Sequence, residues 1–103
     1  MHKLLIKTGF GRVLLDSDAG KHAFRLEPSG GKWLITVEDV SQELADEISR
    51  VLTEVHMFYF ERTPSLDMIQ KWWVYDIQLP LLEYEGTTGK LRLTVDSKVG
   101  YSN

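Results

Sequence analysis

The sequence contains no cysteine, so a disulfide framework, thiolate zinc sites and cysteine nucleophiles are excluded. It also contains no apolar run near the roughly 18 residues that a membrane-spanning helix needs. The apolar run close to the N-terminus is too short for a secretory signal. These absences predict a soluble, cytoplasmic protein without a membrane partner.

Motifs for common catalytic and cofactor sites are missing too. The three Gly-Lys pairs lack both the upstream glycine and the following Ser or Thr of a phosphate-binding P-loop. The histidines His2, His22 and His56 do not have the HExxH spacing of a zinc site, and no GxSxG turn is present. We therefore predict no cofactor and no metal. A small hydrolase-like enzyme, with carboxylates that only folding brings near His22 or His56, stays as an alternative.

The composition itself is that of one folded domain. Hydrophobic residues make up 43% and charged residues 26% of 103 residues, which suits a single domain over 1–103. The net charge is −3, and it is unevenly spread. Residues 1–37 carry six basic and three acidic side chains, and residues 38–67 carry two basic and eight acidic ones. Such an asymmetry can orient a charged partner, but it does not indicate nucleic acid by itself.

The first third of the chain reads as strands. Charged and apolar residues alternate in four segments, which are residues 3–7, 12–16, 22–27 and 32–37. A Gly pair at 30–31 predicts a hairpin loop between the last two. With the apolar residues turned inward, the basic ones would share the outer face of a sheet. A nucleic acid could bind this basic face, which consists of Lys3, Lys7, Arg12, Arg25 and Lys32.

A long amphipathic helix is predicted over about 39–55. Apolar residues recur there at steps of three and four. Asp39 would cap the helix, with Gln42 as its reciprocal partner. The polar side carries an acidic face that could meet a basic partner, formed by Glu43, Asp46, Glu47 and Glu54.

The second half of the chain favours strands, with one ambiguity. Residues 57–61 read as a strand, and residues 81–85 and 90–96 as a second hairpin. The segment 65–79 is open: we favour a strand over 71–79, whereas a helix from 65 to 78 would also align apolar side chains. The polar end, 97–103, is predicted to be a mobile tail. The fold class is α+β, a mostly antiparallel sheet of hairpins with one long helix packed on it.

The aromatic segment 72–75 is the most suggestive candidate for binding. Successive residues of a strand face opposite sides, so Trp72 and Trp73 cannot both enter one core layer. The pattern does not decide which of the two is buried. We expect Trp72 and Tyr75, with Arg62 and Lys71, to anchor an interface.

These observations favour a small non-catalytic domain that recognises a protein partner, of the inhibitor, immunity or adaptor type. Its candidate surfaces are the acidic helix face and the aromatic segment. The alternative is a nucleic-acid-binding domain that uses the basic sheet face. Self-association through sheet edges is compatible with either hypothesis.

Overall fold

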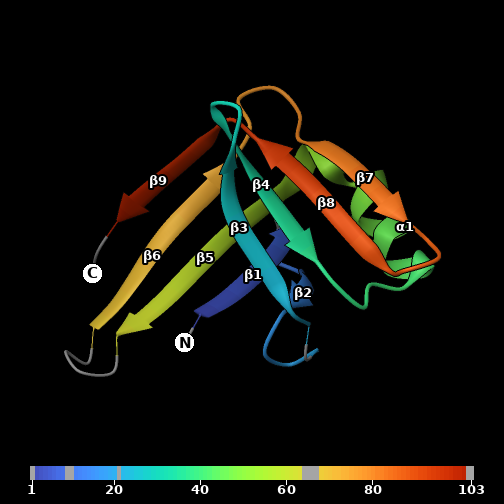
Figure 1. Ribbon diagram of the computed structural model, residues 1–103, viewed down its shortest axis with the longest axis horizontal. Helices are drawn as coiled ribbons and strands as arrows, with labels where there is room; N and C mark the ends of the chain where they lie inside the picture. The colour runs from blue at the N-terminus through green and yellow to red at the C-terminus, as the bar shows by residue number, and fades with distance from the viewer. Residues whose placement is uncertain (1, 9–10, 21, 64–67, 102–103) are drawn as a thin grey trace.

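Two antiparallel sheets and one α-helix make up the described part of the chain. The structure is a computed structural model that describes residues 2–8, 11–20, 22–63 and 68–101, without the side chains of residues 62, 63, 68 and 101. The strands of the two sheets run across one another rather than side by side (Figure 1). This is how twisted sheets pack when they meet at a steep angle. No helix of the described residues is long and apolar enough to cross a membrane.

Sheet A has five strands, in the order β2-β1-β5-β6-β9. They are β1 (His2–Thr8), β2 (Val13–Asp16), β5 (Val55–Thr63), β6 (Met68–Tyr75) and β9 (Ser97–Tyr101). Sheet B has four strands, in the order β3-β4-β8-β7. They are β3 (Phe24–Ser29), β4 (Lys32–Val37), β7 (Leu81–Glu85) and β8 (Lys90–Val95). The prediction of a mostly antiparallel α+β fold is confirmed, with two sheets in place of one.

The hairpins follow the alternation in the sequence. Between β3 and β4 the loop is the Gly pair itself, with φ values of 56° at Gly30 and 83° at Gly31. A side chain at either position would be strained in this left-handed backbone. The β7–β8 hairpin closes through residues 86–89, as predicted. Short connections thus build most of sheet B from neighbouring segments.

The helix is shorter than predicted. Helix α1 spans Gln42–Arg50, and its N-cap is Ser41, whose Oγ accepts a hydrogen bond from the N–H of Leu44 at 3.2 Å. Asp39 does not cap it, because Asp39 lies before the cap in a left-handed turn with φ 58°. That turn directs the chain from β4 into the helix.

The end of the helix also corrects the prediction of 39–55. Val51 leaves helical geometry with φ −113° and ψ 23°, Leu52–Glu54 form a single 3-10 turn, and Val55 already begins β5. β-branched residues lose side-chain freedom in a helix and favour strands. The apolar residue Val55 fits both a helical stripe and the alternation of β5, and pairing with β1 selects the strand.

Two predictions for the last third are also resolved. Residues 68–75 form a strand and not a helix, while residues 65–67 lie outside the described part. The predicted strand over 71–79 is confirmed only to Tyr75, because residues 76–79 do not belong to a strand. Residues 97–101, expected in a mobile tail, form strand β9 instead, and residues 102–103 are outside the description. β9 lacks apolar alternation, but β6 offers it a free row of backbone N–H and C=O groups along its edge.

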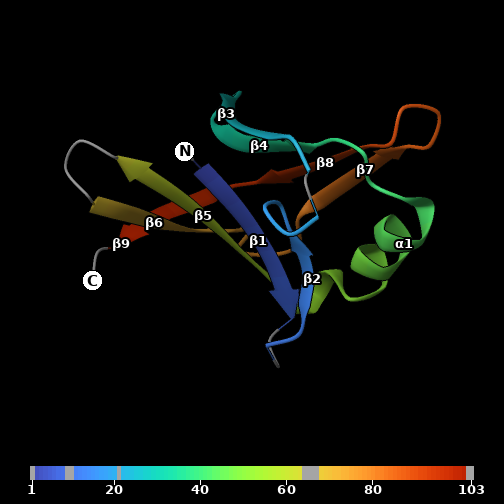
Figure 2. The same ribbon diagram turned by 90° about the horizontal axis from the view of Figure 1, so that it is seen from below.

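The core lies between the sheets, and α1 covers one end of it beside β2 and β7 (Figure 2). It is built from the inward positions of both sheets together with Ala45 and Ile48 of the helix. Leu4, Ile6, Ile35, Val37, Met57, Val74, Leu91, Leu93 and Val95 are its most deeply buried strand residues. The other faces of the two sheets are left as surfaces.

Candidate binding surface

The outer face of sheet A collects aromatic and lysine side chains from three adjacent strands. Leu5 of β1 lies opposite Phe58 of β5, which lies opposite Trp73 of β6, and Trp73 lies opposite Val99 of β9. This row is apolar from strand to strand. A parallel row places Phe60 between Lys3 and Lys71.

We call this surface the aromatic–lysine face. Its members alternate with the buried residues of the same strands, and so they share one side of the sheet. They are Lys3, Leu5, Lys7, His56, Phe58, Phe60, Ile69, Lys71, Trp73, Tyr75 and Val99. Ile69, Trp73 and Val99 are 56%, 36% and 46% exposed, which is high for apolar side chains of this size.

The lysines of this face lie against its rings. The Lys7 Nζ is 5.1 Å from the ring centre of Phe58. The Nζ atoms of Lys3 and Lys71 lie 6.0 Å and 5.8 Å from the ring centre of Phe60. At such distances an ammonium group is attracted to the ring face. The cations therefore cover part of both phenylalanines and stay at the surface.

The remaining rings stack on each other. Trp73 and Tyr75 stack with ring centres 4.3 Å apart, and His56 stacks on Trp73 at 6.1 Å, both at 29° between ring planes. Rings that stack in this way cover part of each other's faces. The result is an apolar ridge bordered by positive charge.

One acid borders the described part of this face. Asp16 lies opposite Leu5, and its carboxylate is 3.4 Å from the Lys3 Nζ. Burial alone would raise the pKa of Asp16, but hydrogen bonds from the N–H groups of Ala19 and Asp18, together with the Lys3 charge, lower it. Asp16 therefore stays ionised at neutral pH and offsets one lysine, leaving Lys7 and Lys71.

The predicted binding residues are divided between two faces. Lys71 and Tyr75 lie on the aromatic–lysine face, whereas Trp72 points inward and stacks on Tyr59 with ring centres 5.3 Å apart. Of the pair, Trp73 is the more exposed and lies on the aromatic–lysine face, whereas Trp72, which was expected at the interface, is half-buried on the inner side of the sheet. The side chain of Arg62 lies outside the described residues.

Two of the four acidic side chains predicted to form a binding face on the helix are engaged in contacts within the chain. Glu47 forms an ion pair with Arg12, which fastens the β1–β2 hairpin to α1. Asp46 accepts a hydrogen bond from the Gln42 Nε2 at 2.9 Å. Glu43 is exposed on the first turn, and Glu54 belongs to the 3-10 turn rather than to the helix.

The predicted basic face is also divided, because the chain forms two sheets. Lys3 and Lys7 lie on the outer face of sheet A, and Arg25 and Lys32 lie on the outer face of sheet B. Arg12 is engaged with the helix. The expectation that these five residues share one face is therefore wrong.

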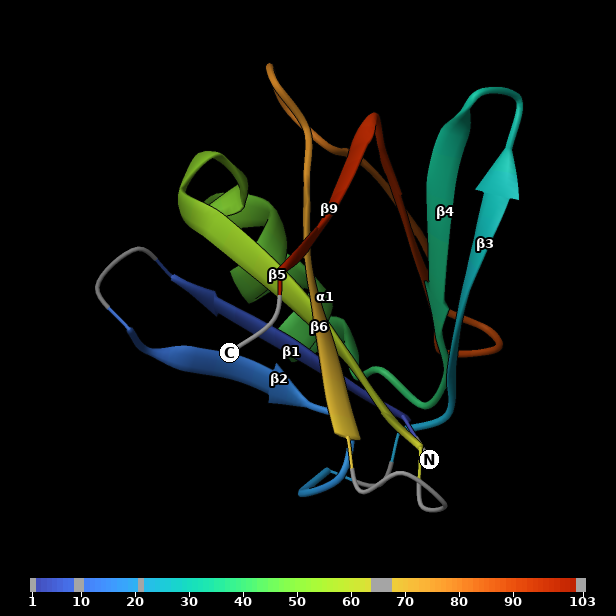
Figure 3. The ribbon, with the colours of Figure 1, turned by 90° about the vertical axis from the view of Figure 1, so that its left-hand side faces the viewer.

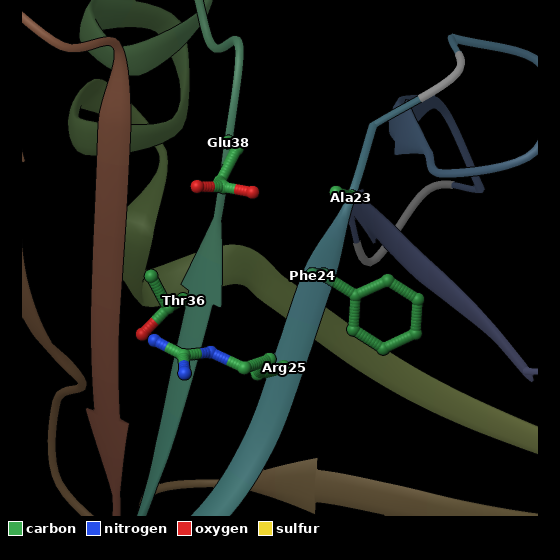
Figure 4. A pocket seen from close by; sticks show the side chains of 5 residues that line it. All are labelled: Ala23, Phe24, Arg25, Thr36 and Glu38. Atoms are coloured by element: carbon green, nitrogen blue, oxygen red, sulfur yellow. The ribbon is translucent and has the colours of Figure 1, made fainter.

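A shallow recess of about 310 Å³ lies on sheet B beside Arg25. Figure 4 shows the Arg25 guanidinium and the Thr36 and Glu38 side chains on one side of β3 and β4, while the ring of Phe24 points away. One cation and one carboxylate at the same recess offset each other. In the described residues no group of three His, Asp or Glu side chains is placed to hold a metal ion.

Comparisons with known protein families, with curated proteins and with solved structures found no match to this chain. The aromatic–lysine face therefore has to be interpreted from its own chemistry.

Sequence reasoning missed Leu5, His56, Phe58, Phe60 and Trp73 as members of one surface. The alternation within residues 57–61 puts Phe58 and Phe60 on one side and Met57 and Tyr59 on the other, and this signal was present in the sequence. The pairing of β5 with β1 was not, because it joins residues from 47 (Thr8 with Val55) to 59 (His2 with Glu61) positions apart. The register of β5 with β6, although the two strands are neighbours in sequence, is not given by the alternation either.

Proposed function

We propose that this chain is a non-catalytic protein-binding domain, and that its partner docks on the aromatic–lysine face. The observation that carries the proposal is the apolar ridge of Leu5, Phe58, Trp73 and Val99 between lysines, in which Trp73 and Val99 are exposed and Leu5 and Phe58 are half-buried. Aromatic side chains supply rigid apolar contact area, and residues of this type dominate the energy of many interfaces.

The charge of the face indicates the character of the partner. The whole chain is acidic, with a net charge of −3, yet this face carries three lysines, and Asp16 is the acid that the register of β1 and β2 places beside them. Complementary charge speeds encounter and penalises wrong partners. The partner is therefore expected to present apolar side chains with carboxylates around them.

A single-stranded nucleic acid is the second candidate, since three lysines alternate with aromatic rings on one sheet. Nucleobases, however, stack on free ring faces. Here the ring faces of Phe58 and Phe60 are approached by lysine ammonium groups, and those of Trp73 and Tyr75 are stacked on each other. The partly covered ring faces leave less room for base stacking, and so they favour a protein.

A matched pair of charge-reversal variants tests the proposal. Lys7→Glu/Lys71→Glu changes the aromatic–lysine face and leaves the Lys3–Asp16 pair intact. Lys32→Glu/Lys90→Glu makes the same net change on the outer face of sheet B. Each protein is immobilised and exposed to nuclease-treated lysate of the source organism, and the retained proteins are quantified by mass spectrometry.

We expect a protein that the wild type and the sheet B variant retain equally, and that the Lys7/Lys71 variant retains at least about tenfold less. Equal retention by all three proteins would show that the partner does not dock on the aromatic–lysine face. A fluorescent 20-nucleotide oligothymidylate is titrated in parallel at several salt concentrations. Tight, steeply salt-dependent binding that only the Lys7/Lys71 variant loses would replace the protein partner with a nucleic acid.

A further inference from the structure

The inner side of β9 carries a lysine in an unusual place. Lys98 points from sheet A towards sheet B, and its Nζ lies 4.5 Å from the ring centre of Trp33 on β4 and 4.5 Å from that of Trp72 on β6. The ring centre of Tyr59 is 6.0 Å away. All four side chains are half-buried.

This arrangement has the form of an aromatic cage. Several ring faces directed at one ammonium group hold it through their quadrupoles, and proteins that recognise alkylammonium ligands use such cages. The cage spans both sheets, because Trp33 belongs to sheet B and the other two rings to sheet A. We propose that Trp33, Trp72 and Tyr59 form a binding site for an alkylammonium group and that Lys98 occupies it, latching β9 to the opposite sheet.

The position of β9 explains why a latch is needed. β9 is an edge strand that follows β8 after a single residue, and the chain passes from one sheet to the other at this corner (Figure 3). Asp96 at the corner accepts hydrogen bonds from the Ile77 N–H and the Ser97 hydroxyl. Beyond the corner β9 has a neighbouring strand on one side only, β6.

The backbone of β9 is shaped to the same cage. Gly100 lies opposite Trp72, and a Cβ added to Gly100 would be 3.0 Å from the indole Nε1. The ring cannot easily retreat, because its face is stacked on Tyr59. Lys98 therefore attracts the Trp72 ring through its charge, and Gly100 leaves the space that this ring occupies.

Release of the latch has a consequence for the opposite side of the strand. Val99 points outward beside Trp73, and so β9 completes the aromatic–lysine face. This consequence rests on the proposed function, whereas the latch does not. Loss of β9 would also uncover the backbone edge of β6, which another strand can pair with.

Hydrogen exchange of the free protein tests the latch without any partner. Lys98→Met removes the charge and keeps the length of the side chain, and Lys98→Arg keeps the charge. In the Met variant, we expect the β9 amides that bond to β6 to exchange about tenfold faster than in the wild type, while the amides of β1 and β8 exchange at the wild-type rate. In the Arg variant, the same β9 amides should exchange within about twofold of the wild-type rate. Equal exchange in both variants, or acceleration in every strand, would overturn the proposal.

A second measurement uses Lys98→Ala, which empties the cage, and adds tetramethylammonium chloride or sodium chloride at equal concentration. Tetramethylammonium should restore protection of β9 and sodium should not. Equal effects of the two salts would contradict a cation site. Trp33→Leu, which removes the ring supplied by sheet B, should abolish the rescue. If Lys98→Ala does not fold, the comparison of Lys98→Met with Lys98→Arg decides alone.

Discussion

The outer faces of the two sheets differ although both are antiparallel and come from one chain. The outer face of sheet B carries both signs of charge, and Arg92 and Glu85 form an ion pair across β8 and β7. The outer face of sheet A carries lysines and rings, with an acid only at its border. A charged, self-paired face is the ordinary solvated side of a sheet, so the difference supports the proposal that a partner docks on sheet A.

Substitutions of the two adjacent tryptophans have the largest expected effects. One should lower the stability of the fold, and the other should weaken binding of the partner. Trp72 packs on Tyr59 and Lys98 inside, whereas Trp73 lies on the aromatic–lysine face. We expect Trp72→Ala to lower the free energy of unfolding by about 3 kcal/mol, at the lower end for a large ring because the site is half-buried. Urea unfolding measures it, and a loss under 1 kcal/mol would contradict the inward placement.

Trp73→Ala should have a small effect on stability and a large effect on partner binding. It removes an exposed ring, so we expect it to cost less than about 1 kcal/mol of stability. Loss of the central ring of the ridge should weaken partner binding by about 2 kcal/mol, or roughly thirtyfold. Titration calorimetry with the captured partner checks this. Leu81→Ala, a similarly exposed apolar residue on sheet B, is the control and should bind normally; equal losses in both variants would make the effect nonspecific.

How far the sequence predicts this contrast depends on the length of chain that each feature involves. Both hairpins of sheet B follow from local alternation and turn glycines, and they were predicted almost to the residue. The face of sheet A needs β1 in register with β5, which lies 47 to 59 residues further along the chain, and no local pattern contains that register. The sequence also shows that one tryptophan of the pair must face outward, but only the register of β6 with β5 shows that it is Trp73.

The C-terminal end of the helix also depends on a tertiary contact that the sequence does not show. The apolar stripe of 39–55 is real, but its last part serves β5 as well as the helix, and the tertiary pairing with β1 decides between them. Glu47 and Arg12 were assigned to two different binding surfaces, since sequence alone does not show that they form an ion pair with each other. Charges that look available in a sequence can be used by the fold itself.

The Arg12–Glu47 ion pair tests whether two residues that sequence reasoning assigned to binding surfaces serve the fold instead. Arg12 is 69% exposed at its side chain, so solvent screens the pair. A double-mutant cycle with Arg12→Ala and Glu47→Ala should give a coupling of about 0.5 kcal/mol, without effect on partner binding. Zero coupling together with weaker binding in Arg12→Ala would return Arg12 to the binding surface.

The smallest effect concerns the acid at the border of the aromatic–lysine face. Asp16 has a lowered pKa in the folded protein, so its ionised form contributes stability above the pKa of the unfolded chain, near 3.8. This contribution is lost as the pH falls through the lower pKa of the folded state. Asp16→Asn keeps an oxygen that can accept from the N–H groups of Asp18 and Ala19 and removes only the charge facing Lys3. We expect the variant to be less stable by about 0.5 kcal/mol at pH 7, and we expect this difference to shrink as the pH is lowered from 5 towards 2. Urea unfolding at each pH measures it.

The same substitution, Asp16→Asn, frees the Lys3 charge on the face, so binding of an acidic partner should strengthen slightly while stability falls. A change of both in the same direction would show that Asp16 contacts the partner itself, and would extend the binding surface from the ridge to the edge strand β2.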